Sequence, residues 1–196
     1  MSGLQPGRSV ILAPGGNNSA QVPLLMYARL AAQRRGASVR VIGWDLAGRQ
    51  DIGQHREMVA SKVAAAVQEL TSATGAAPLL IGKSLASLAA PVAADHGLAA
   101  VWFTPLLTDE PTVAALRRAT GPFLLAGGTA DPYWDGRIAR SLTAEVAEID
   151  GADHAMFVPG PVSASTAVLG QVLTAVEDFL DRAVWPQPGL PPSRHP

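Results

Sequence analysis

The sequence of 196 residues contains no cysteine, which excludes disulfide bonds, thiolate metal sites and a cysteine nucleophile. This absence identifies no redox compartment, because cysteine-free proteins occur in all of them. Charge is also sparse. Charged residues make up only 16% of the chain, the formal net charge is -1, and no block of lysine and arginine stands out. Because nucleic acids and anionic membrane surfaces attract such blocks, we expect neither as a partner.

Long hydrophobic runs are missing as well. The first ten residues, MSGLQPGRSV, lack the charged start and the apolar run of ~7 to 15 residues that a secretory signal needs. No stretch approaches the ~18 uninterrupted apolar residues of a membrane span. We therefore expect a cytoplasmic protein that acts on a small molecule, and we leave a homodimer open.

Apolar residues are plentiful, at 48% of the chain, and they come with 19 glycines and 16 prolines. A chain of this length can build one sizeable core and is short for two. We expect a single domain over residues 1–184. The prolines of the remaining segment, WPQPGLPPSRHP at 185–196, prevent a helix and favour an extended tail.

Short apolar runs alternate with segments of helical periodicity along the chain. The runs predict strands at Ser9–Ala13, Ser38–Gly43, Pro78–Ile81, Ala99–Thr104, Pro122–Ala126 and Glu145–Ile149. Helices are predicted at about 21–35, 56–73, 84–95, 110–119, 132–142 and 163–183. This alternation predicts an α/β protein with three layers: about six mostly parallel strands, covered by helices on both faces. Glu145 and Glu148 place the sixth strand at an edge. In such a sheet ligands bind beyond the carboxyl ends of the strands, where the strand order reverses.

The segment IGKSLAS, residues 81–87, leads from a strand into a helix through one sharp turn with Ser84 at its apex. A serine in such a turn exposes its hydroxyl, and the residues two before and two after it must be small. Gly82 and Ala86 meet that demand, and the helix start that follows would offer the amide of Leu85 to an oxyanion. A plain helix N-cap explains the serine on local grounds equally well. The triplet GKS does not complete a phosphate-binding P-loop, because Ala77 stands where that motif needs glycine.

A histidine able to act as a base follows the sixth predicted strand. His154 lies in the loop IDGADHAMF, whereas His55 and His96 lie at helix ends and His195 lies in the tail. Only His154 is therefore expected at the carboxyl edge of the sheet, within reach of Ser84.

A carboxylate follows the fifth predicted strand, in the segment GGTADPYWD, where Asp131 precedes a proline. A buried carboxylate there would orient the imidazole and stabilise the imidazolium that forms during attack. A simple Asp-Pro turn explains the local sequence too, and Asp135 and Asp109 remain alternative acids. Asp153 is predicted to be a solvated loop residue. The chain order is serine, then acid, then histidine.

The first strand ends in the glycine-rich loop APGGNNSAQ. Its amides can approach an oxyanion without obstruction from side chains, so Gly16 or Asn17 could supply a second donor. The same loop is also simply a favourable turn.

Together these four segments resemble the α/β-hydrolase superfamily, in particular its small lidless bacterial members similar to dienelactone hydrolases. The resemblance covers nearly all of residues 9–182. It implies Ser84 as nucleophile, His154 as base and Asp131 as acid, with oxyanion donors at Gly16 and Leu85. The chain departs from the family pattern at Pro14, where many relatives have histidine, and at Ala86, where many have glycine. It also has no counterpart of the two N-terminal strands of larger members, which implies a minimal six-strand sheet.

The reaction expected from this arrangement is hydrolysis of an ester or thioester of a small hydrophobic or aromatic acyl group, through an acyl-enzyme. Only 17 residues separate the fourth and fifth predicted strands, too few for a cap domain. Four aromatic residues lie just beyond strand ends and could line an apolar pocket or simply pack loops against the sheet: Trp44, Tyr133, Trp134 and Phe157.

Two alternatives remain at this stage. The same triad could serve a lyase, a cyclase or an acyltransferase of small-molecule biosynthesis, because fold and triad do not fix the electrophile or the acceptor. The chain could also be a binding module that has lost turnover. No histidine and carboxylate cluster has the spacing of metal ligands, so no metal and no cofactor is expected.

Overall fold

A computed structural model of the chain describes residues 5, 7–17, 19–48 and 51–186. Part of the N-terminal segment tested above for a signal, and the tail from residue 187 with His195, lie outside the described residues. The described residues form one six-stranded sheet in the order β2-β1-β3-β4-β5-β6, and every pair of neighbouring strands is parallel. The strands are β1 (Ser9–Ala13), β2 (Ser38–Val41), β3 (Leu79–Lys83), β4 (Ala100–Phe103), β5 (Phe123–Gly128) and β6 (Val146–Ile149). β6 lies at an edge, as predicted.

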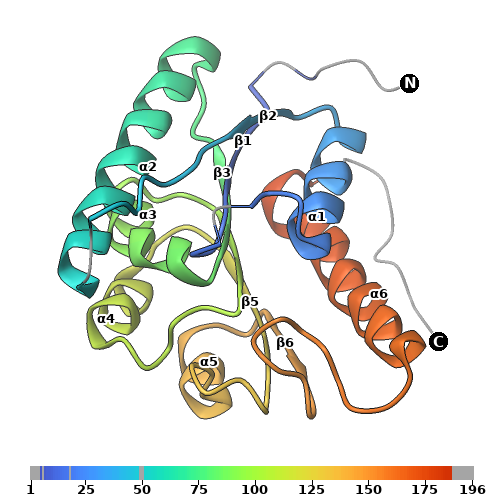
Figure 1. Cartoon of the computed structure of the whole chain (residues 1–196). Coiled ribbons are helices and arrows are strands. Elements are labelled where there is room, and N and C mark those ends of the chain that lie inside the picture. The colour runs from blue at the N-terminus through green and yellow to red at the C-terminus, as the bar shows by residue number, and fades with distance from the viewer. Residues whose placement is uncertain (1–4, 6, 18, 49–50, 187–196) are drawn as a thin grey trace.

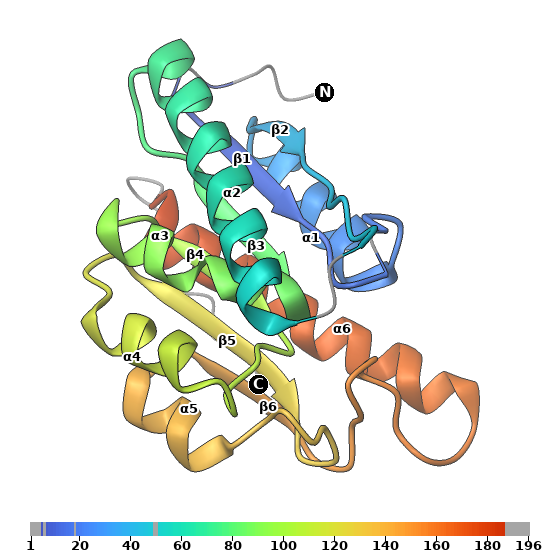
Figure 2. The same cartoon turned by 60° about the vertical axis from the view of Figure 1, so that its left-hand side comes forward.

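Helices cover both faces of this sheet, which confirms the three-layer α/β architecture (Figures 1 and 2). One face carries α1 (Pro23–Arg34) and α6 (Val162–Phe179), which continues into the short π-helix η2 (Leu180–Val184). The opposite face carries α2 (Ile52–Thr74), the 3₁₀ helix η1 (Ser84–Ala89), α3 (Ala90–Asp95), α4 (Glu110–Arg118) and α5 (Gly136–Leu142).

The strands contribute side chains alternately to two separate cores, as the two-residue period of a strand requires. In β3, Leu80 packs into the core beneath α2, whereas Leu79 and Ile81 pack into the core beneath α1 and α6. The same alternation runs through β1, β4 and β5. Because both faces are buried, these strands are nearly continuous apolar runs in the sequence.

Three predicted helices differ in the structure. The helix predicted at 56–73 begins at Ile52, because Asp51 caps it by accepting the amide of Gln54. The helix predicted at 84–95 is divided into η1 and α3, with Pro91 in the first turn of α3. Proline lacks the amide that an uninterrupted helix would use, and it is favourable in a first turn. The helix predicted from residue 132 begins only at Gly136, because Asp135 caps it by accepting the amides of Arg137 and Ile138.

Between β4 and β5 the structure has α4 and its connecting loops and no inserted domain, as the short spacing predicted. Trp185, predicted to be the first residue of the tail, is held against the rest of the structure. Its amide donates to the carbonyl of Leu180, and the guanidinium of Arg8 lies 5.6 Å from the centre of its indole ring. No helix within the described part of the chain is both long and apolar enough to cross a bilayer.

Candidate active site

The candidate site lies where the strand order reverses. The chain passes from β1 to β2 on one side of β1 and then crosses to β3 on its other side. The carboxyl ends of β1 and β3 therefore border the crevice in which parallel sheets bind ligands. The glycine-rich loop leaves one of these ends and Ser84 directly follows the other.

Ser84 occupies the sharp turn predicted for it. Its backbone φ is 50°, in the left-handed region that costs a residue with a side chain about 1–2 kcal/mol. The turn requires close packing on both sides. A Cβ atom added to Gly82 would lie 2.9 Å from the Cβ of Ala86 and 2.9 Å from the indole of Trp102. The small residues on either side of Ser84 are thus a steric requirement of the turn, which a plain N-cap does not have.

His154 and Asp131 approach Ser84 from two distant segments. The Ser84 Oγ lies 2.8 Å from His154 Nε2, and His154 Nδ1 lies 2.8 Å from the Asp131 carboxylate. With the Nδ1–H donating to that carboxylate, the Nε2 lone pair accepts the hydroxyl proton of Ser84. The three side chains form one continuous hydrogen-bonded relay at the carboxyl edge of the sheet.

Asp131 is held by its own turn. It is only 3% exposed, and its second carboxylate oxygen accepts the amide of Tyr133. The Tyr133 ring meets the imidazole of His154 edge to face, with the ring centres 5.1 Å apart. The two alternative acids have other partners: Asp135 caps α5, and Asp109 caps α4 and pairs with Arg56. Among these three, it is Asp131 that the structure places against the histidine.

The histidine loop is shaped by Asp153, which sequence reasoning treated as a solvated residue. Its side chain is exposed, but its Oδ1 accepts the amides of both Ala155 and Phe157. The loop then turns through Met156, whose φ is 66°. The histidine loop packs directly against β5 at Gly128, where an added Cβ would overlap the backbone of Ala152. Position 128 therefore accepts no side chain without moving the loop that carries His154.

Lys83 is a residue of the candidate site that sequence reasoning missed. As the last residue of β3 it follows Ile81 on the α1 and α6 face, so its stem is largely buried. Its ammonium donates to the Thr104 hydroxyl at 3.1 Å and to the His154 carbonyl at 3.0 Å. Burial lowers the pKa of Lys83, and the carboxylates of Asp131 and Asp153 oppose that shift. A lysine ending an otherwise apolar strand immediately before a nucleophile was the available signal.

The glycine-rich loop lies against the nucleophile. A Cβ built on Gly15 would lie 3.5 Å from the Cβ of Ser84, and Gly16 has open space around it. Asn17 is exposed, and its side-chain oxygen accepts the amide of Ser19. The amide of Leu85, in the first turn of η1, has no acceptor within its own helix because of its position. Gly16, Asn17 and Leu85 thus lie on the two segments that meet at Ser84.

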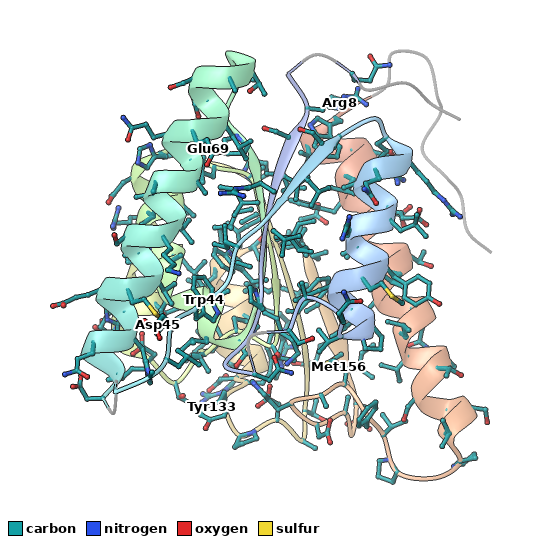
Figure 3. The ribbon with its side chains drawn as sticks, turned by 45° about the horizontal axis from the view of Figure 1, so that its top comes forward. Arg8, Trp44, Asp45, Glu69, Tyr133 and Met156 are labelled. Atoms are coloured by element: carbon teal, nitrogen blue, oxygen red, sulfur yellow. The ribbon has the colours of Figure 1, made fainter. Side chains whose placement is uncertain are left out.

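The predicted pocket aromatics occupy different places. Trp44 is 4% exposed and its indole N–H donates to the Pro14 carbonyl at 2.8 Å, so it fastens the glycine-rich loop from the α2 side. Trp134 donates to Glu148 and packs over Gly127 on the same face. Figure 3 shows Trp44 near α2, and Tyr133 and Met156 at the end of the molecule opposite Arg8.

An apolar cavity of about 530 Å³ opens beside His154 on the other face, between the starts of α1 and α6. Phe157, 60% exposed, lines it together with Met156 and Lys83. Trp44, Tyr133 and Trp134 do not. Of the four aromatic residues predicted to line a pocket, Phe157 therefore lines the cavity beside the relay.

No group of three or more histidine and carboxylate side chains within the described residues is arranged to hold a metal ion.

No family model matches the sequence, and a search of curated proteins finds no match. The fold is similar to solved structures. An α/β serine hydrolase homologue from Coxiella burnetii aligns with a TM-score of 0.70 at 14% identity, over 91% of this chain and 87% of the other. An α/β serine hydrolase without a lid from Xanthomonas campestris aligns with a TM-score of 0.67 at 15% identity, over 94% and 85%. Est1E from Butyrivibrio proteoclasticus, solved with ferulic acid bound, aligns with a TM-score of 0.69 at 12% identity, over 92% and 90%. The chain therefore has the α/β-hydrolase fold in its small, lidless form.

Proposed function

We propose that this chain is a serine hydrolase that cleaves an ester or thioester of a small hydrophobic or aromatic acyl group. The hydrogen-bonded relay from Ser84 through His154 to Asp131, with both contacts at 2.8 Å, carries the proposal. A left-handed serine in a turn of this kind costs energy, and such strain persists where the surrounding structure and the chemistry require it.

The first half of the reaction acylates the serine. His154 Nε2 takes the Ser84 hydroxyl proton while Oγ bonds to the substrate carbonyl carbon, and the carbonyl oxygen becomes an oxyanion. The amides of Leu85 and Gly16 are the proposed donors to that oxyanion, with the amide of Asn17 as an alternative second donor. The bond to the leaving oxygen or sulfur then breaks, and Nε2 gives its proton to the departing atom.

The second half returns the enzyme to its starting state. A water molecule loses a proton to Nε2 and attacks the acyl carbon, and the Ser84 oxygen leaves with that proton. The carboxylate of Asp131, with its second oxygen held by the Tyr133 amide, stabilises the imidazolium in both halves. The side chain of His154 is 31% exposed, which supports direct access of that water to Nε2.

The surroundings of the relay support a hydrophobic substrate. Tyr133 contacts the imidazole, and Phe157 lines the apolar cavity beside it. The ferulic acid bound to the similarly folded Est1E is an aromatic acid, which supports an aromatic acyl group among the candidates.

A fluorophosphonate probe and a set of p-nitrophenyl esters test the proposal. The wild type should be labelled by the probe and hydrolyse the esters, and Ser84→Ala should lose the label and the turnover. Ser141→Ala, at an exposed position of α5, is the control and should keep both. No label on the wild type, or equal label on Ser84→Ala, would reject a serine nucleophile. Analysis of the products for free acid separates hydrolysis from acyl transfer and from lyase or cyclase chemistry.

A further inference from the structure

The cavity of about 530 Å³ beside His154 has a defined position relative to the relay. Its walls come from Pro23 and Leu24 at the start of α1, from Met156 and Phe157 of the histidine loop, and from Thr166 and Leu169 of α6. His154 and Asn17, the alternative second oxyanion donor, are part of the lining, whereas Leu85 and Gly16, the two preferred oxyanion donors, are not. The cavity therefore lies on the histidine side of the relay.

The two parts of an ester occupy different positions around such a relay. The carbonyl oxygen faces the oxyanion donors, and the leaving atom must lie within hydrogen-bond reach of Nε2, because Nε2 gives it the proton taken from Ser84. The body of the leaving group therefore continues past the imidazole. Building on the proposed function, we propose that this cavity binds the leaving alcohol or thiol of the substrate and so selects for it.

The chemistry of the walls defines the occupant. Two charged side chains line the cavity, Lys83 and Asp153, and both already have partners within the protein. The Lys83 ammonium donates to the Thr104 hydroxyl and to the His154 carbonyl, and the Asp153 Oδ1 accepts two loop amides. The wall carries one charge of each sign, so it gives no net attraction to a charged occupant, which would lose its hydration among mainly apolar side chains.

The remaining walls are mainly apolar, and the volume lies within the range of about 300–1,000 Å³ that is usual for small-molecule sites. The occupant is therefore an uncharged alcohol or thiol with an aliphatic chain or a single aromatic ring. In the reaction the bond from Ser84 Oγ to the carbonyl carbon forms first; the bond from that carbon to the alcohol or thiol then breaks, and the alcohol or thiol departs carrying the serine proton.

Two ester series distinguish this inference from an acyl-binding role. The first series consists of acetate esters in which the alcohol lengthens from ethyl to octyl. The second series consists of methyl esters in which the acid lengthens. We expect kcat/KM, which reports acylation, to rise more steeply with chain length in the alcohol series.

The variant Thr166→Trp, on the exposed side of α6, narrows the cavity. It should lower the ratio of kcat/KM for octyl acetate over ethyl acetate by about 10-fold to 100-fold, the range that small differences of fit in an apolar site produce. Thr174→Trp makes the same substitution at an exposed position of the same helix outside the cavity, and it should leave the ratio unchanged.

Binding of octan-1-ol to Ser84→Ala, followed by NMR, reads the cavity without turnover. We expect specific binding that Thr166→Trp weakens and Thr174→Trp does not. If Thr166→Trp alters selectivity in the acid series instead, or alters neither series, the inference is overturned. If the wild type hydrolyses no ester while octan-1-ol binds as expected, the proposed function fails, and with it the leaving-group role of the cavity, although the cavity still binds an uncharged alcohol.

Discussion

The two faces of the sheet are covered differently, and the difference explains where the chemistry lies. The α2 to α5 face is filled by indoles packed onto glycines: Trp102 lies against Gly82, and Trp134 lies against Gly127. The α1 and α6 face has only two long helices, whose starts leave the cavity open beside His154. The α2 to α5 face thus supports the turn at Ser84, whereas the α1 and α6 face carries the histidine loop and gives a substrate room.

Neighbouring glycines of β5 offer the strongest test of this contrast, because they point to opposite faces. A Cβ at Gly127 would overlap the indole of Trp134, and one at Gly128 would overlap the backbone of Ala152 in the histidine loop. Gly128→Ala should displace His154 and lower kcat/KM by about 100-fold, as small misplacements of catalytic groups do. Gly127→Ala should mainly lower the free energy of unfolding, by about 1–3 kcal/mol.

Ester kinetics and chemical denaturation of the two variants measure both effects. Equal loss of kcat/KM in the two variants would show that the faces do not divide these tasks.

Substitution of Lys83 is the second test, because this residue of β3 hydrogen-bonds to the histidine loop on the α1 and α6 face. Lys83→Met removes both hydrogen bonds of the ammonium and should lower kcat/KM about 10-fold, an effect on the loop equal to about 1.4 kcal/mol. The chain has one other lysine, Lys62, whose ammonium donates to the Gly43 carbonyl at the surface. Lys62→Met is therefore the matched control and should keep wild-type turnover.

The pH dependence of stability gives Lys83 a second readout. Burial lowers its pKa in the folded state below the unfolded value of about 10.4, so between these two values the unfolded chain binds more protons. The contribution of Lys83 to the free energy of unfolding should rise with pH over that interval. Lys83→Met should lack this rise in denaturation curves recorded at increasing pH, and a profile identical to the wild type would contradict a buried ammonium.

Asp109 provides the smallest of the three expected effects, on the closely packed face. Burial raises the pKa of Asp109, but hydrogen bonds from Arg56 and Thr112 more than offset it, so the pKa lies below its ordinary value. The stabilisation from this carboxylate is complete above the unfolded value of about 3.9 and is lost as pH falls through the folded value. Asp109→Asn should cost about 1 kcal/mol at pH 7, because solvent at the partly exposed pair screens the interaction.

Denaturation at several pH values checks this expectation. The difference between wild type and Asp109→Asn should shrink as the pH falls below 4, while turnover at pH 7 is kept. A difference that stays constant with pH would contradict the ion pair with Arg56.

The strand ends explain how much of the fold and of the candidate site could be predicted from the sequence. Parallel strands put all their carboxyl ends at one edge, so Ser84, Asp131 and His154 could be placed at that edge without coordinates. The face on which a side chain lies depends on where its strand stops. β3 extends two residues beyond the predicted Ile81, and this extension brings Lys83 onto the α1 and α6 face.

The positions of loop side chains were harder to predict from the sequence. Trp44 and Phe157 look alike in the sequence because both follow a strand, yet one hydrogen-bonds to the glycine-rich loop and the other lines the cavity. Their difference arises from loop turns, such as the one at Met156, that no periodic pattern encodes. For the same reason the choice among Asp109, Asp131 and Asp135 required the observed caps.

These three carboxylates allow the most direct test of the relay, through kcat/KM of Asp131→Asn, Asp109→Asn and Asp135→Asn on one ester. Asparagine at position 131 cannot hold the required imidazole tautomer, so Asp131→Asn should lose about 10³-fold to 10⁴-fold. Asp109→Asn and Asp135→Asn should remain near wild type, because their side chains cap helices. Near-wild-type turnover of Asp131→Asn, or an equal loss in all three variants, would contradict the Ser84, His154 and Asp131 relay.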